Sequence, residues 1–358
     1  MALWPFSLVW PGGLVNNQVP LHSDLNKLDE QQAQAADGSA WTDITFAGNY
    51  PYFVTDATGG LVCLYNPVAK YFYSLGVSGV DPVGFQARSP FIVRTAQSLP
   101  AGAGLIPAVG AVDPVRGTMF IGGAPNTSSQ SRIRTNTGLT TSWVAANTAK
   151  AAGTTGPTSA IYCLGTIDKH FIGYASGEIE SSTGASAGAT WANIGSLPNS
   201  NARSSMAFSP TLNRLVVVTT GSTSYITSDD GTTFAARTAP ANFHTVFWSS
   251  FRSLFYATTN VSPNFYSSPD GITWTSLGAG ADHPGGTSAG AVQFFEYRRL
   301  IGCLGQGHLA LSVDGLASWS EVAAFNTIAG FAARSDNGFQ ALFANSAGDH
   351  KASLRIGA

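Results

Sequence analysis

The chain has few charged residues and few cysteines. Of its 358 residues 11% are charged, and the formal net charge is −2, so no basic surface for nucleic acid is expected. The three cysteines, Cys63, Cys163 and Cys303, are an odd number without the short spacing of a zinc site or a disulfide framework. The sequence therefore predicts buried thiols, with no metal and no cofactor.

Long apolar runs and catalytic motifs are lacking as well. No run of 18 apolar residues occurs, which argues against membrane insertion. The first nine residues are apolar, but they lack a basic start and prolines interrupt the run, so no signal peptide is expected. The histidines show no metal-ligand spacing, and neither G-x-S-x-G nor a phosphate-binding loop is present. These absences predict no catalytic residues.

The chain does contain a repeated sequence motif, Ser-x-Asp-Gly followed closely by an aromatic residue, which we call the phrase. An Asp in a turn accepts hydrogen bonds from backbone N–H groups two residues on, and Gly takes a positive φ. The aromatic residue then opens the next strand, so the phrase predicts a structural turn and not a metal or catalytic site. The three clear copies comprise Ser228, Asp230, Gly231 and Phe234; Ser268, Asp270, Gly271 and Trp274; and Ser312, Asp314, Gly315 and Trp319.

The phrase is part of a longer repeat. Looser copies precede Trp143 and Trp191, so the aromatic residue recurs every 40 to 48 residues. Each clear copy follows two short apolar runs separated by a turn, as around residues 209–214 and 249–252. A period in the forties built from short strands is typical of four-stranded propeller blades. The predicted fold is an all-β propeller.

The number and limits of the blades follow from this period. Seven units fit between Ile44 and the last residue, with six or eight left open. The first blade is expected at 44–75, a hairpin at 84–105, and a strand near 41–46 that closes the ring against the last strands. The predicted domains are an N-terminal arm at 1–40 and a propeller at 41–358.

The phrase resembles the Asp-box, or BNR repeat, of sialidases and of many non-enzymatic propellers. The resemblance implies a propeller with the boxes at the blade rims, away from the central site. Sialidase chemistry needs three arginines, a Tyr nucleophile paired with a Glu, and an acidic proton donor, and the family's early Arg-Ile-Pro signature is absent here. Of the propeller glutamates, Glu178, Glu180, Glu296 and Glu321, only Glu296 beside Tyr297 suggests such a pair. We expect a solvated turn there, and a glycan-cleaving or glycan-binding propeller remains the alternative.

The first forty residues form the second informative region. Residues 1–20 carry many apolar side chains and no charge, and Ser23 is placed to cap a helix at about 24–36 with a narrow apolar stripe. Large apolar stretches on soluble proteins mark interaction sites, so this region is predicted to be an arm that docks on a partner. The residues expected to bind that partner are Trp4, Phe6, Trp10, Leu14, Leu25 and Leu28.

The segment 23–32 is similar to the attachment regions of bacteriophage tail-fibre and related virion proteins. The resemblance implies a protein assembled into a virion in the host cytoplasm, with the arm docked on other tail or virion proteins. The propeller would be displayed to contact the host surface or a cell-surface glycan, and a homo-oligomer is expected. The predicted function is that of a non-enzymatic structural and receptor-binding component.

Overall fold

The computed structural model describes strands and their turns along most of the chain from Trp41 onward. The ranges it describes are 41–44, 62–78, 81–87, 94–96, 105–125, 132–136, 143–146, 156–184, 190–197, 204–220, 222–259, 264–279, 293–297, 300–305, 308–312, 315–317, 320–324, 328–334, 340–345 and 350–354. The helix predicted at 24–36 and the arm residues Trp4, Phe6, Trp10, Leu14, Leu25 and Leu28 lie outside these ranges.

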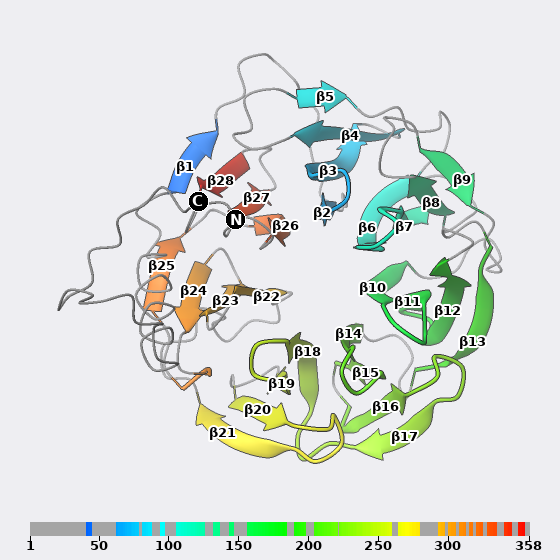
Figure 1. Cartoon of the computed structure of the whole chain (residues 1–358), viewed down its shortest axis with the longest axis vertical. Helices are drawn as coiled ribbons and strands as arrows, with labels where there is room; N and C mark the ends of the chain where they lie inside the picture. The colour runs from blue at the N-terminus through cyan, green and yellow to red at the C-terminus, as the bar shows by residue number, and fades with distance from the viewer. Residues whose placement is uncertain are drawn as a thin grey trace, which may run out of the picture.

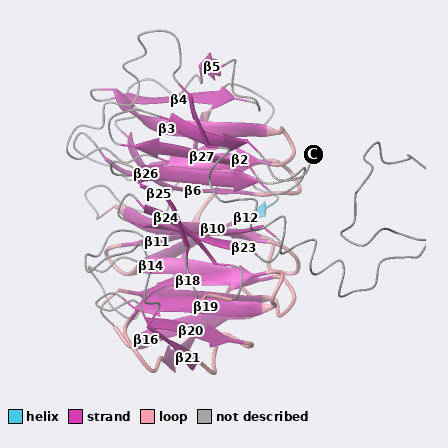
Figure 2. Ribbon diagram, turned by 90° about the vertical axis from the view of Figure 1, so that its left-hand side faces the viewer, coloured by secondary structure: helices cyan, strands magenta, loops and turns pink. Residues whose placement is uncertain are grey.

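The described strands form seven antiparallel sheets of four strands each, arranged in a ring (Figure 1). The first strand of each sheet lies nearest the centre of the ring and the fourth lies at its outer edge. Figure 2 shows that the strands run along the axis viewed in Figure 1, so their turns lie at the two ends of the ring. The predicted all-β fold of four-stranded blades is confirmed, and the blade number of the complete ring remains a prediction.

We number the sheets as blades 1 to 7 in chain order. Blades 1 to 3 consist of β2 (Val62–Asn66), β3 (Tyr71–Ser78), β4 (Asp81–Ala87) and β5 (Arg94–Ala96); β6 (Leu105–Val112), β7 (Met119–Pro125), β8 (Arg132–Asn136) and β9 (Val144–Ala146); and β10 (Pro157–Cys163), β11 (Lys169–Tyr174), β12 (Glu178–Thr183) and β13 (Ala192–Ser196). Blades 4 and 5 consist of β14 (Ser204–Ser209), β15 (Arg214–Thr219), β16 (Ser224–Ser228) and β17 (Ala235–Thr238); and β18 (Phe243–Ser249), β19 (Leu254–Thr259), β20 (Asn264–Ser268) and β21 (Thr275–Ala279). Blades 6 and 7 consist of β22 (Gln293–Tyr297), β23 (Leu300–Gly305), β24 (His308–Ser312) and β25 (Ser320–Ala324); and β26 (Ile328–Arg334), β27 (Gln340–Asn345), β28 (His350–Leu354) and β1 (Trp41–Ile44).

The ring closes by pairing the two ends of the described chain. Strand β1 is the outer strand of blade 7 and pairs antiparallel with β28, with Trp41 opposite Ser353. This is the closing strand that the sequence predicted. The predicted first blade at 44–75 is wrong, because blade 1 comprises β2 to β5 and the 84–105 segment supplies parts of its third and fourth strands. Because this blade lacks a clear box, its end could not be located from the residues alone.

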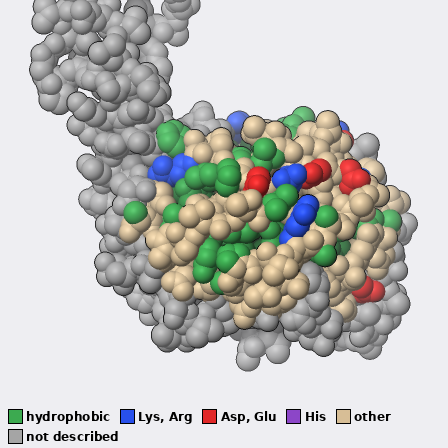
Figure 3. Space-filling view, turned by 90° about the horizontal axis from the view of Figure 1, so that it is seen from below, with side chains coloured by type: hydrophobic (Ala, Val, Ile, Leu, Met, Phe, Trp, Pro, Cys, Tyr) green, Lys and Arg blue, Asp and Glu red, His purple; other side chains and the backbone are tan. Residues whose placement is uncertain are grey.

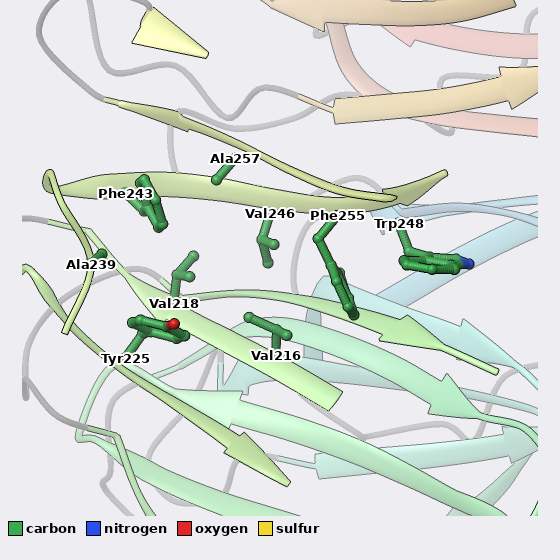
Figure 4. Packing of buried hydrophobic residues seen from close by; sticks show 10 residues of the cluster. Val216, Val218, Tyr225, Ala239, Phe243, Val246, Trp248, Phe255 and Ala257 are labelled. Carbon is green, nitrogen blue, oxygen red and sulfur yellow. The ribbon is translucent and has the colours of Figure 1, made fainter. Parts of the chain in front are cut away.

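The hydrophobic core lies between neighbouring blades, and strand β15 shows why. Its side chains alternate between the two faces of the sheet. Leu215 and Val217 pack toward blade 3, with Phe171 in the same cluster, whereas Val216 and Val218 pack toward blade 5. Figure 4 shows the second cluster, in which aromatic and branched side chains from blades 4 and 5 interdigitate. Strand β15 is therefore apolar on both faces and covered on both.

Candidate interaction face

Two kinds of turn lie at the same end of the ring. In a four-stranded antiparallel sheet, the turn from the first to the second strand and the turn from the third to the fourth lie at the same end of the strands. We call the first the inner turn, because it lies near the centre of the ring, and the second the box turn, because it carries the Ser-x-Asp-Gly phrase.

The box turns of blades 4 and 5 have closely similar hydrogen bonds. In blade 4, Asp230 Oδ1 accepts from the backbone N–H groups of Thr232 and Thr233, both at 2.7 Å. These bonds lower the pKa of Asp230 to about 2. In blade 5, burial of Asp270 opposes ionisation, but the N–H groups of Ile272 and Thr273, at 2.8 and 2.7 Å, outweigh it and lower the pKa to about 2.

The glycines of the box turns have positive φ and are covered by neighbouring side chains. Gly231 and Gly271 have φ of 64° and 70°. A Cβ on Gly231 would lie 2.6 Å from Ile167 of blade 3, and one on Gly271 would lie 2.7 Å from Val216 of blade 4. The box turns are therefore wedged against the preceding blade, an arrangement that serves blade packing.

Polar and aromatic side chains of the preceding blade complete this packing. Lys169 Nζ donates to Gly231 O at 2.9 Å, and Arg214 Nη1 donates to Asp270 O at 2.7 Å. Trp274 is half-buried, and its Nε1 donates to Tyr225 Oη of blade 4 at 3.0 Å. The aromatic residue that follows a box thus lies against the preceding blade, and not in the interior of its own sheet.

The remaining predicted box residues are described in part. Phe234 is partly buried and packs against the cluster between blades 3 and 4. In the third copy, Gly315 has φ of 79° and Ser312 Oγ accepts from Leu316 N–H at 2.9 Å. Ser228 and Ser268 donate to Asp230 and Asp270, at 3.1 and 2.9 Å. Asp314 and Trp319 lie outside the described residues.

The inner turns have a second repeated geometry that the sequence reasoning missed. In four of them a fully buried polar side chain accepts a hydrogen bond from the turn backbone, and the residue four positions later has a positive φ. The pairs of capping and positive-φ residues are Asn66 and Lys70, Asp113 and Gly117, Ser209 and Asn213, and Ser249 and Ser253. The four-residue spacing was available in the sequence, but three different residue types act as the cap.

Hydrogen bonds join neighbouring inner turns. Asn66 Nδ2 of blade 1 donates to Gly117 O of blade 2 at 2.7 Å. Arg116 of blade 2 donates two bonds to Asp168 of blade 3, at 2.7 and 2.8 Å, and a third to the buried Asp113 at 2.8 Å. The bidentate Arg116 contact lowers the pKa of Asp168 and is the largest cause of the raised pKa of Arg116 itself.

Glu296 makes the corresponding contact between blades 6 and 5. The half-buried carboxylate contacts Ser249 Oγ and accepts from the N–H groups of Ser250 and Phe251, at 2.8 and 3.1 Å. Burial raises its pKa, and these hydrogen bonds oppose that rise. The expectation of a solvated turn at Glu296 is wrong, because the side chain caps the inner turn of the preceding blade.

The tips of the inner turns are apolar and exposed, although their caps are buried. Every large exposed hydrophobic residue of the described chain lies on an inner turn, except Leu277 on β21. We call these residues the tips, and one lies in each of blades 1 to 5: Val68 (41% exposed), Val115 (62%), Leu164 (37%), Leu212 (39%) and Phe251 (44%). Because the first strands lie nearest the centre of the ring in Figure 1, the inner turns that carry the tips lie at one end of the ring, near its centre. The side of the ring seen in Figure 3 also carries hydrophobic side chains, which lie near the middle of the view with charged side chains beside them.

Beneath the tips of blades 2 and 3 lies a buried histidine. The His170 side chain is 1% exposed and neither ring nitrogen has a hydrogen-bond partner. Phe120, Tyr162 and Trp191 surround it, with ring centroids 4.7 to 6.5 Å away. Burial lowers its pKa to about 4, against the opposing effect of the nearby carboxylates Asp113 and Asp168. The ring is therefore neutral and acts as an aromatic packing element.

One Tyr–Glu pair bears on the enzymatic alternative. Tyr174 Oη donates to Glu180 at 2.7 Å, which is the pairing that a sialidase nucleophile requires. Both side chains are buried, at 0% and 1% exposed, and burial is the largest cause of the raised pKa of the phenol. A buried phenol of raised pKa is a poor nucleophile, so this geometry favours a structural role.

The described residues contain no group of three or more His, Cys, Asp or Glu side chains placed to hold a metal ion. Within the same ranges, no helix reaches the length and hydrophobicity that a membrane span requires.

Comparison with known proteins identifies the fold. No protein-family model matches the chain, and no curated protein is detectably similar in sequence. The chain is similar in structure to a streptogramin B lyase (TM-score 0.63, 11% identity, 88% of this chain and 98% of the other) and to virginiamycin B lyase from Staphylococcus aureus (0.62, 9%, 88% and 99%). It is also similar to YCF48 from Cyanidioschyzon merolae (0.56, 11%, 88% and 98%). The protein is a β-propeller. At these identities the likeness concerns the fold alone.

Proposed function

We propose that this propeller is a non-enzymatic structural and binding component of a virion, such as a tail fibre or tail-associated protein. The end of the ring that carries the inner turns faces the particle. Residues 1–40 form the arm that docks on other virion proteins, and the propeller at 41–358 is displayed for contact with the host surface or a glycan.

The observation that carries the proposal is the direction of strand β1. Trp41 pairs with Ser353 at the end of β28, and Leu354 pairs with Gln340, which opens β27 directly after the inner turn of blade 7. The chain therefore enters β1 from the inner-turn end. The entry to β1 and the five exposed apolar tips thus lie at the same end of the ring, and large apolar surfaces mark sites of association.

The non-enzymatic part of the proposal rests on the side chains of the described residues. The carboxylates of the inner turns are engaged in capping and ion pairing, and Tyr174 is buried with a raised pKa. Contact with a glycan is assigned to the opposite end, because the inner-turn end is taken up by assembly.

The test is to purify virus particles from cells that produce the chain and to search for the chain by mass spectrometry. We expect it in the particles, and we expect the full-length Trp4→Asp, Trp10→Asp variant to be absent from them. Leu277→Asp, on the outer side of the ring, is the control and should be incorporated normally. A chain missing from the particles contradicts the virion role. Hydrolysis of a sialoside or another glycoside by the purified chain contradicts the non-enzymatic role.

A further inference from the structure

The inner-turn tips are apolar, and the charged groups beside them in blades 2 and 3 are engaged within the ring, because Arg116 pairs with Asp168 and Lys169 donates to Gly231 O. Arg116 is bound to Asp113 and Asp168, and the Asp113 side chain is fully buried. Above these pairs, the tips Val115 and Leu164 are 62% and 37% exposed. Such a surface favours an occupant that is apolar and uncharged over an ionic one.

We propose that, in the chain before it joins any assembly, the occupant is residues 1–20 of the same chain, seated on the tips of the inner turns. This inference goes beyond the virion role and does not require it. The segment has the matching chemistry, since it has no charged residue and carries Trp4, Phe6, Trp10 and further aliphatic side chains. Aromatic side chains bury about 150–250 Å² each, so three of them would bring about 450–750 Å² of apolar area to the contact.

The connection is long enough for this contact. Residues 21–40 join the segment to Trp41, which lies at the inner-turn end. A helix over 24–36 would span about 20 Å at 1.5 Å per residue, and the other linker residues would add roughly 20 Å when extended. The sum, about 40 Å, exceeds the radius of gyration of about 20 Å expected for a domain of this size.

The same tether favours the chain's own segment over that of a second copy. A linker whose length matches the distance between the two sites gives an effective concentration that approaches the millimolar range. A second molecule competes only when the protein itself approaches that concentration.

Photo-crosslinking in the full-length chain tests the inference. A photoreactive amino acid is placed at Leu212, a tip, and in a second preparation at Leu277, which is similarly exposed at 43% but lies on the outer strand β21. Irradiation of the first preparation should link position 212 to a residue within 1–20, at a yield at least tenfold above that of the second. Mass spectrometry of a mixture of isotopically light and heavy chains should find this link within single molecules.

Three results would overturn the inference: no link to residues 1–20, equal yields at the two positions, or links that join light to heavy chains. The last result would assign the surface to a second copy. A second measurement does not depend on the photoreactive residue. In hydrogen exchange of the full-length chain, Leu212→Asp should speed exchange in residues 1–20 at least tenfold, whereas Leu277→Asp should leave it unchanged. Equal exchange in both variants would also overturn the inference.

Discussion

The box turns and the inner turns lie at the same end of the ring and differ in what they bury. Both are stabilised by a polar side chain that accepts hydrogen bonds from the turn backbone. In the box turns the glycine lies beneath the preceding blade, and Gly231 and Gly271 have no room for a Cβ. In the inner turns the cap is buried and an apolar tip projects outward, as at Asp113 and Val115. The box turn, which is the more regular in sequence, therefore packs neighbouring blades together. The inner turn, which is less regular, exposes an apolar side chain.

A glycine substitution gives the largest effect that separates these roles. In Gly271→Ala, the new Cβ would lie 2.7 Å from Val216 and 3.1 Å from Phe255, both fully buried, at a φ of 70°. Left-handed backbone costs about 1–2 kcal/mol and overpacking about 1–3 kcal/mol. The free energy of unfolding should fall by about 3 kcal/mol in chemical denaturation.

Gly278→Ala is the matched control for this substitution. Gly278 also has a positive φ, 89°, but no atom would lie within 4 Å of its Cβ. The loss there should be about 1 kcal/mol, from the backbone alone. Equal losses at the two glycines would mean that the box turn is not wedged against the preceding blade.

The stability of the folded protein should depend on pH through His170, which lies beneath the inner turns, over a different pH range from the box aspartates. The pKa of His170 in the folded protein is about 4, below the ordinary value of 6.5, so the unfolded chain binds the proton first. Stability should hold above pH 6.5 and fall by about 3 kcal/mol as the pH drops toward 4. In His170→Phe this slope should disappear, because the group that binds the proton is removed. The variant should fold, since the substitution breaks no hydrogen bond of the ring nitrogens.

Thermal unfolding between pH 7 and pH 2 measures both effects. The pKa values of Asp230 and Asp270 are lowered to about 2, so their contribution is present above about pH 4 and is lost between pH 4 and pH 2. This second loss should persist in His170→Phe. A wild-type slope between pH 6.5 and pH 4 that survives the substitution would show that another group causes it.

The sequence predicted the blades because their key residues recur at one spacing. An Asp, a Gly and an aromatic residue at fixed offsets, repeated every 40 to 48 residues, indicated both the turn and the strand that follows it. The closing strand β1 could be predicted because the last apolar runs lacked a fourth strand. Blade 1 was misplaced because no box marks its third turn.

The inner-turn surface could not be predicted in the same way. Its caps are Asn, Asp and Ser, which share only an oxygen that accepts a backbone hydrogen bond, so no single residue type marks this position in every blade. Its tips become one surface only when the ring brings the turns together. The ion pair between Arg116 and Asp168 joins residues 52 positions apart, and nothing in the intervening sequence indicates it.

Removing a box carboxylate should lower the free energy of unfolding moderately and leave assembly unchanged. Asp270→Ala removes the acceptor for two backbone N–H groups, comparable with the loss of a helix cap, which costs about 0.5–2 kcal/mol. Thr275→Ala, at an exposed position just beyond the same turn, should change the free energy of unfolding by less than about 0.5 kcal/mol. Incorporation into particles should be the same in both variants. A normal melting temperature together with loss of incorporation would instead assign Asp270 to the assembly surface.

The smallest effect on stability is expected at a tip. The same substitution, Val→Ser, can be made at a tip and at a valine buried against a box turn, so that the two kinds of turn are compared directly. Val115 is 62% exposed, so Val115→Ser should change the free energy of unfolding by less than about 0.5 kcal/mol. Val216 is fully buried against Gly271, and Val216→Ser should cost about 2–4 kcal/mol, because it leaves a cavity and buries a hydroxyl. Hydrogen exchange should show the reverse order for residues 1–20: at a temperature where both variants are folded, Val115→Ser should reduce their protection more than Val216→Ser. If Val115→Ser leaves that protection at the wild-type level, the tip of blade 2 takes no part in holding the segment.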